Sequence, residues 1–108
     1  MPKELTIVEI IEAGSDELNL NEIVKQGALL IADHMCANRE NYEFPKKETI
    51  AGVSFFIALF EFRESPIDVK ATWENISEVV GRSVETLKNC YYKYVSYRED
   101  DPSKWKNL

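Results

Sequence analysis

The stretch Ile50-Ala-Gly-Val-Ser-Phe-Phe-Ile-Ala-Leu-Phe60 decides the fold of this 108-residue chain. Its apolar side chains would point in every direction around a helix axis, so it predicts a helix from about Glu48 to Phe62 that other helices surround. Gly52, Ser54 and Ala58 are small enough to let those helices approach closely. A buried strand is the alternative interpretation, and the length of the run favours a helix.

Two helices are predicted before this stretch. The first covers about Leu5 to Ala13 and is expected to stop at Gly14. The second runs from about Leu20 to Asn38, with Asn19 as its N-cap and Glu22 completing a capping box. The apolar stripe of this second helix is expected to contain Ile23, Ala28, Leu30, Ile31 and Met35.

The rest of the chain is predicted to hold one loop and two more helices. Residues Asn38 to Lys47 are polar and contain Pro45, which disfavours helix at the residue before it, so a loop is expected there. A short fourth helix is predicted from Thr72, its cap, to Val80. Ser83 is expected to cap the fifth helix, from about Val84 to Tyr97. The inner side of the fifth helix is expected to carry Leu87, Tyr91, Tyr94 and Val95.

Residues 72–97 have the spacing of a helix-turn-helix. Gly81 can supply the positive φ that the turn requires, and Ser77, four residues earlier, is small enough for two helices to cross steeply. Leu87 lies within the first six positions after the glycine, where such a motif buries an apolar side chain. An ordinary helical hairpin in a bundle has the same spacing, so both interpretations stay open.

The outward-facing side chains near the start of the last helix are the candidate DNA contacts. Lys88 is expected to donate to guanine and Asn89 to adenine. Lys70, Arg82 and Lys93 are expected to neutralise phosphates. The full candidate set is Lys70, Arg82, Ser83, Glu85, Lys88, Asn89, Tyr92 and Lys93.

Charge is distributed unevenly along the chain, whose net charge is −6. Residues 1–45 hold three basic and nine acidic side chains, whereas residues 46–108 hold ten of each. A DNA duplex would therefore be repelled by the first half and tolerated by the second. Glu85, on the candidate recognition helix, either accepts from a cytosine amino group or repels the DNA backbone, and the sequence leaves both open.

Composition and motifs narrow the class of protein. The chain is 44% hydrophobic and reads as one domain over residues 1–108, with a polar tail at 98–108 in which Trp105 is expected to contact the domain or a partner. The longest apolar run is too short to cross a bilayer, and the N-terminus lacks the order of a signal peptide. Cys36 and Cys90 form no CxxC pair and suit a reducing compartment. We therefore expect an intracellular protein without a membrane partner.

No catalytic or cofactor motif stands out. His34-x-Cys36 has no second ligand pair at zinc-site spacing and is interpreted as a helix end rather than a metal site. The single histidine has no nucleophile at fixed spacing, and no glycine-rich loop could cradle a phosphate. The sequence therefore predicts no enzyme activity, no cofactor and no small-molecule substrate.

One segment carries a family resemblance. Gly81-Arg-Ser-Val-Glu-Thr-Leu-Lys-Asn-Cys-Tyr91 resembles the last helix of a cyclin-type repeat in transcription factor IIB and its archaeal relatives. Thr86-Leu87-Lys88 stands where the family has a Thr-Ile/Val-Arg triplet, and Tyr91 stands at its tyrosine. Ile50 to Ala58 is similar to the wholly buried third helix of the repeat, and Leu20-Asn-Glu-Ile-Val24 to the start of its second. The resemblance covers nearly the whole chain.

This resemblance implies an all-α fold: a five-helix cyclin-like repeat around a buried central helix, closest to the second repeat of the family and ending in a helix-turn-helix. It implies a role in transcription initiation, in which the fifth helix binds promoter DNA together with a TATA-binding protein, and RNA polymerase is a further candidate partner. The family's base-reading arginine maps to Lys88. Its small apolar reader maps to Glu85, which is a departure from the family pattern.

The sequence shows neither the zinc ribbon nor the second repeat of the family. We therefore expect a fragment, a divergent partner-binding protein or a subunit that works with other chains, in the nucleus of a eukaryote or the cytoplasm and nucleoid of an archaeon. The competing hypothesis is a cyclin-fold module that binds another protein and no DNA. The net charge and Glu85 favour this alternative, whereas the turn at Gly81 favours DNA binding.

Overall fold

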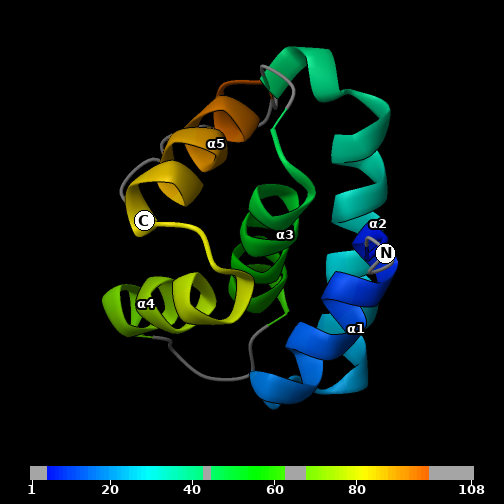
Figure 1. The fold of residues 1–108 in the computed structure, drawn as a ribbon, viewed down its shortest axis with the longest axis vertical. Helices are drawn as coiled ribbons and strands as arrows, with labels where there is room; N and C mark the ends of the chain where they lie inside the picture. The colour runs from blue at the N-terminus through cyan, green and yellow to red at the C-terminus, as the bar shows by residue number, and fades with distance from the viewer. Residues whose placement is uncertain (1–4, 43–44, 63–67, 98–108) are drawn as a thin grey trace, which may run out of the picture.

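The computed structural model describes residues 5–42, 45–62 and 68–97, and every regular element in these ranges is helical. The elements are α1 (Ile7–Glu17), α2 (Glu22–Ala37), the short 3-10 helix η1 (Arg39–Tyr42), α3 (Lys47–Glu61), α4 (Val69–Val80) and α5 (Val84–Tyr97). Helix α3 lies at the centre, and the other four α-helices contact it from different sides (Figure 1).

The central position of α3 confirms the prediction made from its apolar sequence. Every residue from Thr49 to Ala58 is buried, so no side of the helix faces solvent over this stretch. The Phe56 ring stacks on Trp73 of α4, with the ring centroids 3.9 Å apart and 8° between the planes. The same ring meets Tyr91 of α5 edge-on at 5.4 Å. These aromatic contacts join α3, α4 and α5 in one core.

Helix α1 begins at Ile7, two residues after the predicted start at about Leu5, and ends later than predicted. Thr6 and Glu9 form a capping box: the Thr6 hydroxyl accepts from the Glu9 N–H at 3.2 Å, and the Glu9 carboxylate accepts from the Thr6 N–H at 3.0 Å. The prediction that Gly14 stops the helix is wrong, because α1 continues to Glu17. Gly14 is buried against α3, and a Cβ there would lie 2.6 Å from a Phe55 ring carbon. This glycine therefore serves close helix packing.

Helix α2 begins two residues later than expected. Asn21 is its N-cap and accepts from the Val24 N–H at 2.9 Å, whereas Asn19, the predicted cap, lies before the helix with φ +56°. The predicted apolar stripe is also wrong at two positions. Ile23 and Leu30 face outward, with exposed fractions of 64% and 72%. The buried positions of α2 are Val24, Gly27, Ala28, Ala32 and Met35.

Small side chains explain why α2 turns this face inward. Helix α2 makes its most extensive helix contact with α3. Small side chains let two helix backbones approach closely, which favours such a contact. Ala28 and Ala32 meet this requirement, and Gly27 leaves room for the Phe62 ring at the end of α3. The larger Ile23 and Leu30 side chains therefore remain on the outer side.

Two further predicted boundaries need correction. The region from Asn38 to Lys47 is not all loop, because Arg39–Tyr42 forms the 3-10 helix η1. Helix α4 starts at Val69, three residues before the predicted start at Thr72. Its cap is Asp68, whose carboxylate accepts from the Ala71 N–H at 3.0 Å. The Thr72 hydroxyl instead donates to the Asp68 carbonyl inside the first turn, at 2.7 Å.

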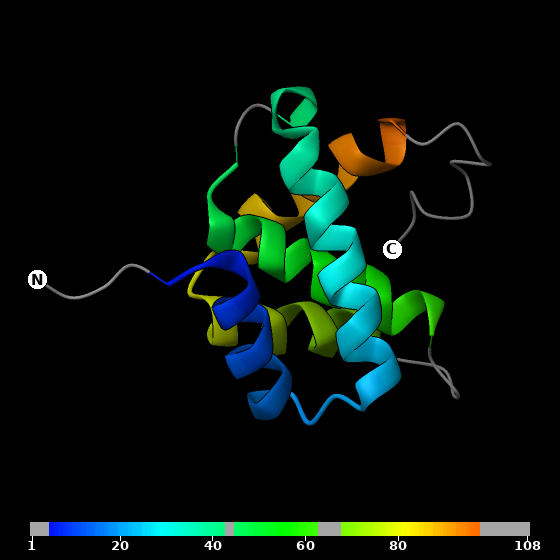
Figure 2. The ribbon, with the colours of Figure 1, turned by 90° about the vertical axis from the view of Figure 1, so that its right-hand side faces the viewer.

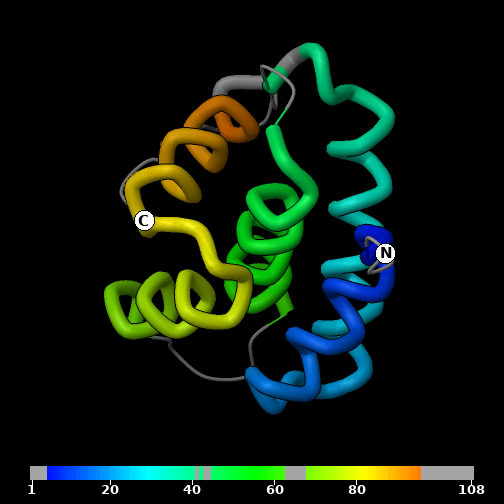
Figure 3. The backbone as a smooth tube through the Cα atoms, in the orientation of Figure 1, coloured from blue at the N-terminus to red at the C-terminus, as the bar shows by residue number. Residues whose placement is uncertain are grey.

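Helix α5 agrees with its prediction in both bounds and inner side. It spans Val84–Tyr97, and Leu87, Tyr91, Tyr94 and Val95 are buried. The connection from α4 into α5 runs beside α3 (Figure 3). A quarter turn brings α2 in front of α3, with α5 on the far side (Figure 2). The predicted polar tail at 98–108, with Trp105, lies outside the described residues.

Candidate nucleic-acid interface

The connection between α4 and α5 is a tight turn closed by two hydrogen bonds. Gly81 has φ +74° and ψ +27°, the left-handed conformation that the sequence predicted. Its N–H donates to the Ser77 carbonyl at 2.9 Å. The Ser77 hydroxyl donates in turn to the Arg82 carbonyl at 2.6 Å. Nothing lies within 4 Å of a Cβ placed on Gly81, so the backbone conformation alone explains the glycine.

Two contacts hold the start of α5: a side-chain cap by Ser83 and the packing of Leu87 on α3. The Ser83 hydroxyl accepts from the Thr86 N–H at 3.1 Å, which confirms Ser83 as the cap. Leu87, one turn into the helix, is fully buried. It packs on α3 at Gly52, where an added Cβ would lie 2.5 Å from the Leu87 Cδ2 atom. The first turn of α5 is therefore anchored, and its outer side chains have a defined position.

The predicted contact residues do not all lie together, and those within α5 lie on different sides of that helix. Arg82, Asn89 and Lys93 line one hollow of about 280 Å³, together with Lys46 from just before α3. Lys88 and Tyr92 lie on a row turned by about 100° around the helix axis from Asn89 and Lys93. The five predicted residues outside this hollow are Lys70, Ser83, Glu85, Lys88 and Tyr92.

Exposure differs among the eight predicted residues. The side chains of Lys70, Ser83, Glu85, Asn89 and Tyr92 are exposed, and those of Arg82, Lys88 and Lys93 are half-buried. Half-burial of a long cationic side chain places its stem against the protein and its head at the surface. Lys70 lies in the first turn of α4, apart from the cations that surround the start of α5.

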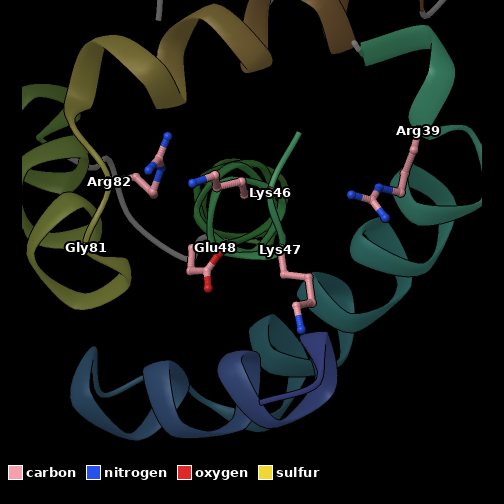
Figure 4. Close-up of a pocket in the computed structure, with 6 residues that line it drawn as sticks. All are labelled: Arg39, Lys46, Lys47, Glu48, Gly81 and Arg82. Atoms are coloured by element: carbon pink, nitrogen blue, oxygen red, sulfur yellow. The ribbon is translucent and has the colours of Figure 1, made fainter. Parts of the chain in front are cut away.

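A larger hollow of about 740 Å³ lies over the N-terminal end of α3, next to the smaller one. Its described lining consists of Arg39, Lys46, Lys47, Glu48, Gly81 and Arg82 (Figure 4). Arg39 reaches in from the α2–η1 side, and Lys46 extends over the end of α3 toward Arg82. Four cations and one carboxylate therefore surround this space.

Sequence reasoning missed three of these cations. All three lie in the stretch from Asn38 to Lys47, for which the sequence predicts a loop. The adjacent lysines before a buried helix were the only visible signal. Their closeness to Arg82, 35 or more positions away along the chain, depends on how the α4–α5 connection packs beside α3.

Two cations of the larger hollow donate to backbone carbonyl groups. The Arg39 Nη2 atom donates to the Pro45 carbonyl at 2.9 Å, and the Lys47 Nζ atom donates to the Leu5 carbonyl at 2.8 Å. The Nε atoms of Arg39 and Arg82 are buried and lack a hydrogen-bond partner within the part of the chain that is described. Lys46, the N-cap of α3, makes no side-chain cap.

The two thiols are poor nucleophiles at neutral pH. Burial raises the pKa of the Cys90 thiol to about 11, although the nearby Lys93 ammonium acts in the opposite direction. Burial also raises the pKa of Cys36. A thiol in this state stays protonated and behaves as a small apolar group. Cys90 accordingly forms part of the wall of the smaller hollow.

The described residues contain no candidate metal site and no candidate membrane span. In ranges 5–42, 45–62 and 68–97, no group of three or more His, Cys, Asp or Glu side chains could hold a metal ion. No helix in the same ranges is long and apolar enough to cross a bilayer. Comparisons with protein-family models, with curated protein sequences and with solved structures find no match.

Proposed function

We propose that this chain is a DNA-binding domain in which α4, the turn at Gly81 and α5 act as a helix-turn-helix. The observation that carries the proposal is the gathering of Arg82, Asn89 and Lys93 with Lys46 around one hollow beside α5. In such motifs the start of the second helix contacts base edges, while cations and helix ends nearby hold phosphates. The first turn of α5 is held by the Ser83 cap and by Leu87. Asn89 and Lys93 lie along one side of the helix, with Arg82 and Lys46 next to them.

The finer form of the proposal follows the family resemblance. In it the chain is a cyclin-like repeat similar to those of transcription factor IIB, and it binds promoter DNA together with a TATA-binding protein in transcription initiation. Five α-helices in the described ranges, with α3 buried at their centre, support this form. Lys88 then takes the place of the family's base-reading arginine, and RNA polymerase is a further candidate partner.

The net charge of −6 does not oppose this mode of binding, because the charges are separated in space. The acidic side chains of α1 and α2 are Glu9, Glu12, Asp16, Glu17, Glu22 and Asp33. Helix α2 lies on the opposite side of α3 from α5 (Figure 2). Packed helices are about 8–10 Å apart, so two layers place α2 about 16–20 Å from α5. The Debye length at physiological salt is only about 8 Å.

The test is equilibrium binding of labelled duplexes, measured by fluorescence anisotropy with and without TATA-binding protein. One duplex carries a TATA box and its flanks, and the other has the same base composition in scrambled order. We expect binding that weakens as salt rises. Lys88→Ala should reduce the preference for the TATA duplex. Lys93→Ala should weaken binding to both duplexes and lower the salt slope by about 1.

Lys25→Ala is the matched control, because it removes the same charge from α2. It should leave DNA binding unchanged, and the thermal midpoints of all three variants should stay close to that of the wild type. Absence of binding to both duplexes at low salt, with and without TATA-binding protein, would rule out the DNA-binding proposal.

A second candidate function is a protein-interaction module, and the outer side of α2 favours it. Ile23 and Leu30, seven residues apart, lie on one side of that helix and are largely exposed. Phe62 packs over Gly27 between them, and its ring remains 41% exposed. Exposed apolar side chains in such a row are typical of surfaces that bind a partner helix. The acidic residues of the same helix, Glu22 and Asp33, would favour a basic partner.

Calorimetry of the chain with TATA-binding protein in the absence of DNA separates the two candidates. An interaction module should bind the partner without a duplex, and Leu30→Asp should abolish this binding. A chain that uses only α5 should show no effect of Leu30→Asp on its DNA complex.

A further inference from the structure

The hollow over the N-terminal end of α3 combines features of an anion-binding site. Three separate segments build it: η1 supplies Arg39, the start of α3 supplies Lys46 and Lys47, and the α4–α5 connection supplies Arg82 (Figure 4). Its volume of about 740 Å³ leaves room for a small anion or for part of a larger one. This hollow shares Lys46 and Arg82 with the smaller hollow beside α5, and adds Arg39, Lys47 and the N-terminal end of α3.

Charge is the first reason to expect a ligand there. Four cations surround the hollow, and Glu48 is the single carboxylate among its described lining residues. Gathering like charges on a concave surface raises the local potential and destabilises the empty site. In a chain of net charge −6, such a cluster does not arise from an excess of basic residues. An anion bound among the four side chains would relieve the repulsion.

Unsatisfied donors are the second reason. The Arg39 and Arg82 Nε atoms are buried without a hydrogen-bond partner among the described residues. Leaving a buried charged donor without an acceptor lowers stability. Both atoms belong to side chains that line the hollow. Because the two Nε atoms are shielded from solvent, the oxygen atoms of a ligand would reach them once the guanidinium groups turn toward the hollow.

The start of α3 adds backbone donors to these side chains. Helices α1, α2 and α4 each have a side-chain cap, from Thr6, Asn21 and Asp68. Ser83 serves α5 in the same way. Helix α3 begins after Lys46, which provides no side-chain cap to the N–H groups of the first turn. The positive end of the helix dipole reinforces the attraction for an anion.

We propose that this hollow binds a phosphoryl group, held by Arg82, Arg39 and Lys46 at the N-terminal end of α3. Guanidinium groups present several N–H donors in a planar fork that matches phosphate oxygens. A tetrahedral phosphoryl group can reach donors on several sides of the hollow at once, which a planar carboxylate does less well. The phosphoryl group belongs either to a DNA backbone or to a small phosphate compound. The DNA source rests on the proposed function.

Inorganic phosphate and pyrophosphate are the probes, titrated into the ¹⁵N-labelled full chain at constant ionic strength with chloride as the reference anion. We expect saturable shifts of the Glu48, Thr49, Gly81 and Arg82 amide signals, and a thermal midpoint that rises with pyrophosphate. Removing one charged donor should weaken pyrophosphate binding about 10- to 150-fold, since a hydrogen bond to a charged group contributes about 1.5–3 kcal/mol and 1.4 kcal/mol is a factor of ten. Lys46→Gln and Arg82→Ala are the variants that test this.

Arg82→Lys and Lys25→Ala serve as controls. The first keeps the charge but loses the fork, so its affinity should fall between those of wild type and Arg82→Ala. The second removes a charge outside the hollow and should bind pyrophosphate like the wild type. Equal binding by wild type, Lys46→Gln and Arg82→Ala would overturn the proposal. So would shifts spread over all lysines without saturation.

Duplex titrations identify the source of the phosphoryl group. Where a backbone phosphate fills the hollow, Lys46→Gln should lower the salt slope of DNA binding by about 0.9, and pyrophosphate should compete with the duplex. Where a small phosphate compound is the ligand, pyrophosphate should bind the DNA complex as well as the free chain. Saturable pyrophosphate binding by a chain that binds no DNA would support the hollow and contradict the proposed function.

Discussion

The Ser77 hydroxyl donates a 2.6 Å hydrogen bond to the Arg82 carbonyl, across the left-handed residue Gly81. This contact ties the last turn of α4 to the residue that precedes α5. It also holds the backbone from which the Arg82 side chain reaches the larger hollow. A single serine therefore links the geometry of the turn to the position of a cation in the candidate interface.

Ser77→Ala should lower the free energy of unfolding by about 0.5–1.5 kcal/mol, the usual net contribution of one hydrogen bond. The Arg82 carbonyl would then lose the hydroxyl that donates to it, while Gly81 keeps the left-handed conformation of the turn. Urea denaturation gives the measurement. Asn75→Ala, at an exposed position of the same helix, is the control and should stay within about 0.5 kcal/mol of wild type. Equal stability of both variants would contradict a structural role for Ser77.

Gly14→Ala and Gly27→Ala should change stability in different ways, although a Cβ would be crowded at both positions. At Gly14 the new methyl would lie 2.6 Å from the fully buried Phe55 ring, so about 1–3 kcal/mol of stability should be lost. At Gly27 it would meet the ring of Phe62, which is 41% exposed and can rotate away. Alanine also favours helix by about 0.5–1 kcal/mol.

The Gly27→Ala variant is therefore expected to be close to wild type in stability, or more stable. Thermal melting of the two variants in parallel provides the comparison. A larger loss at Gly27 than at Gly14 would mean that Phe62 is held as firmly as Phe55.

Ala58→Leu should destabilise the chain by about 1–3 kcal/mol, because Ala58 is fully buried near the end of α3 and extra methyl groups would overpack the core. Ala71→Leu makes the same change at an exposed position of α4 and should have little effect. Differential scanning calorimetry of the two variants tests this. If Ala58→Leu melts like wild type, α3 is not surrounded on all sides.

Alkaline pH should destabilise the fold through Cys90. Burial raises the pKa of this thiol to about 11 in the folded chain, above its ordinary value of 9.0. Its contribution to stability is therefore fully present below pH 9 and is lost as the pH rises toward 11. Cys90→Ala removes the titrating group, so its stability should fall less steeply than that of wild type between pH 8.5 and 10.5. Denaturant titrations at several pH values measure the two slopes, and equal slopes would contradict the assignment.

Features encoded within a few residues were predictable from the sequence. The apolar run around Phe55 and Phe56 predicted a buried central helix, because no orientation of it leaves a polar side for water. Gly81 predicted a left-handed turn, and Ser83 predicted the start of α5. Each rests on a local rule of backbone conformation or on the side-chain pattern of a single helix. A local rule does not separate Asn19 from Asn21, because asparagine suits an N-cap at either position, and the structure has Asn21 there.

Features that need two distant segments were not predictable. The inner side of α2 is not predictable from its own sequence, because close contact with α3 favours small residues such as Ala28 and Ala32 in the interface and leaves Ile23 and Leu30 outside. Gly14 was taken for a helix stop because its contact with Phe55 spans 41 residues of chain. In both cases close packing with another helix overrode the preference of the isolated segment.

The sequence by itself determined the helical class, the buried α3, the left-handed turn at Gly81 and the side of α5 that faces the core. Only the tertiary structure decided that Arg39, Lys46 and Lys47 lie around the same hollow as Arg82. The reason is physical: helix formation depends on neighbours three or four positions apart, whereas a charged hollow depends on how finished helices pack. The candidate interface is therefore a product of packing, built on elements that the sequence specifies locally.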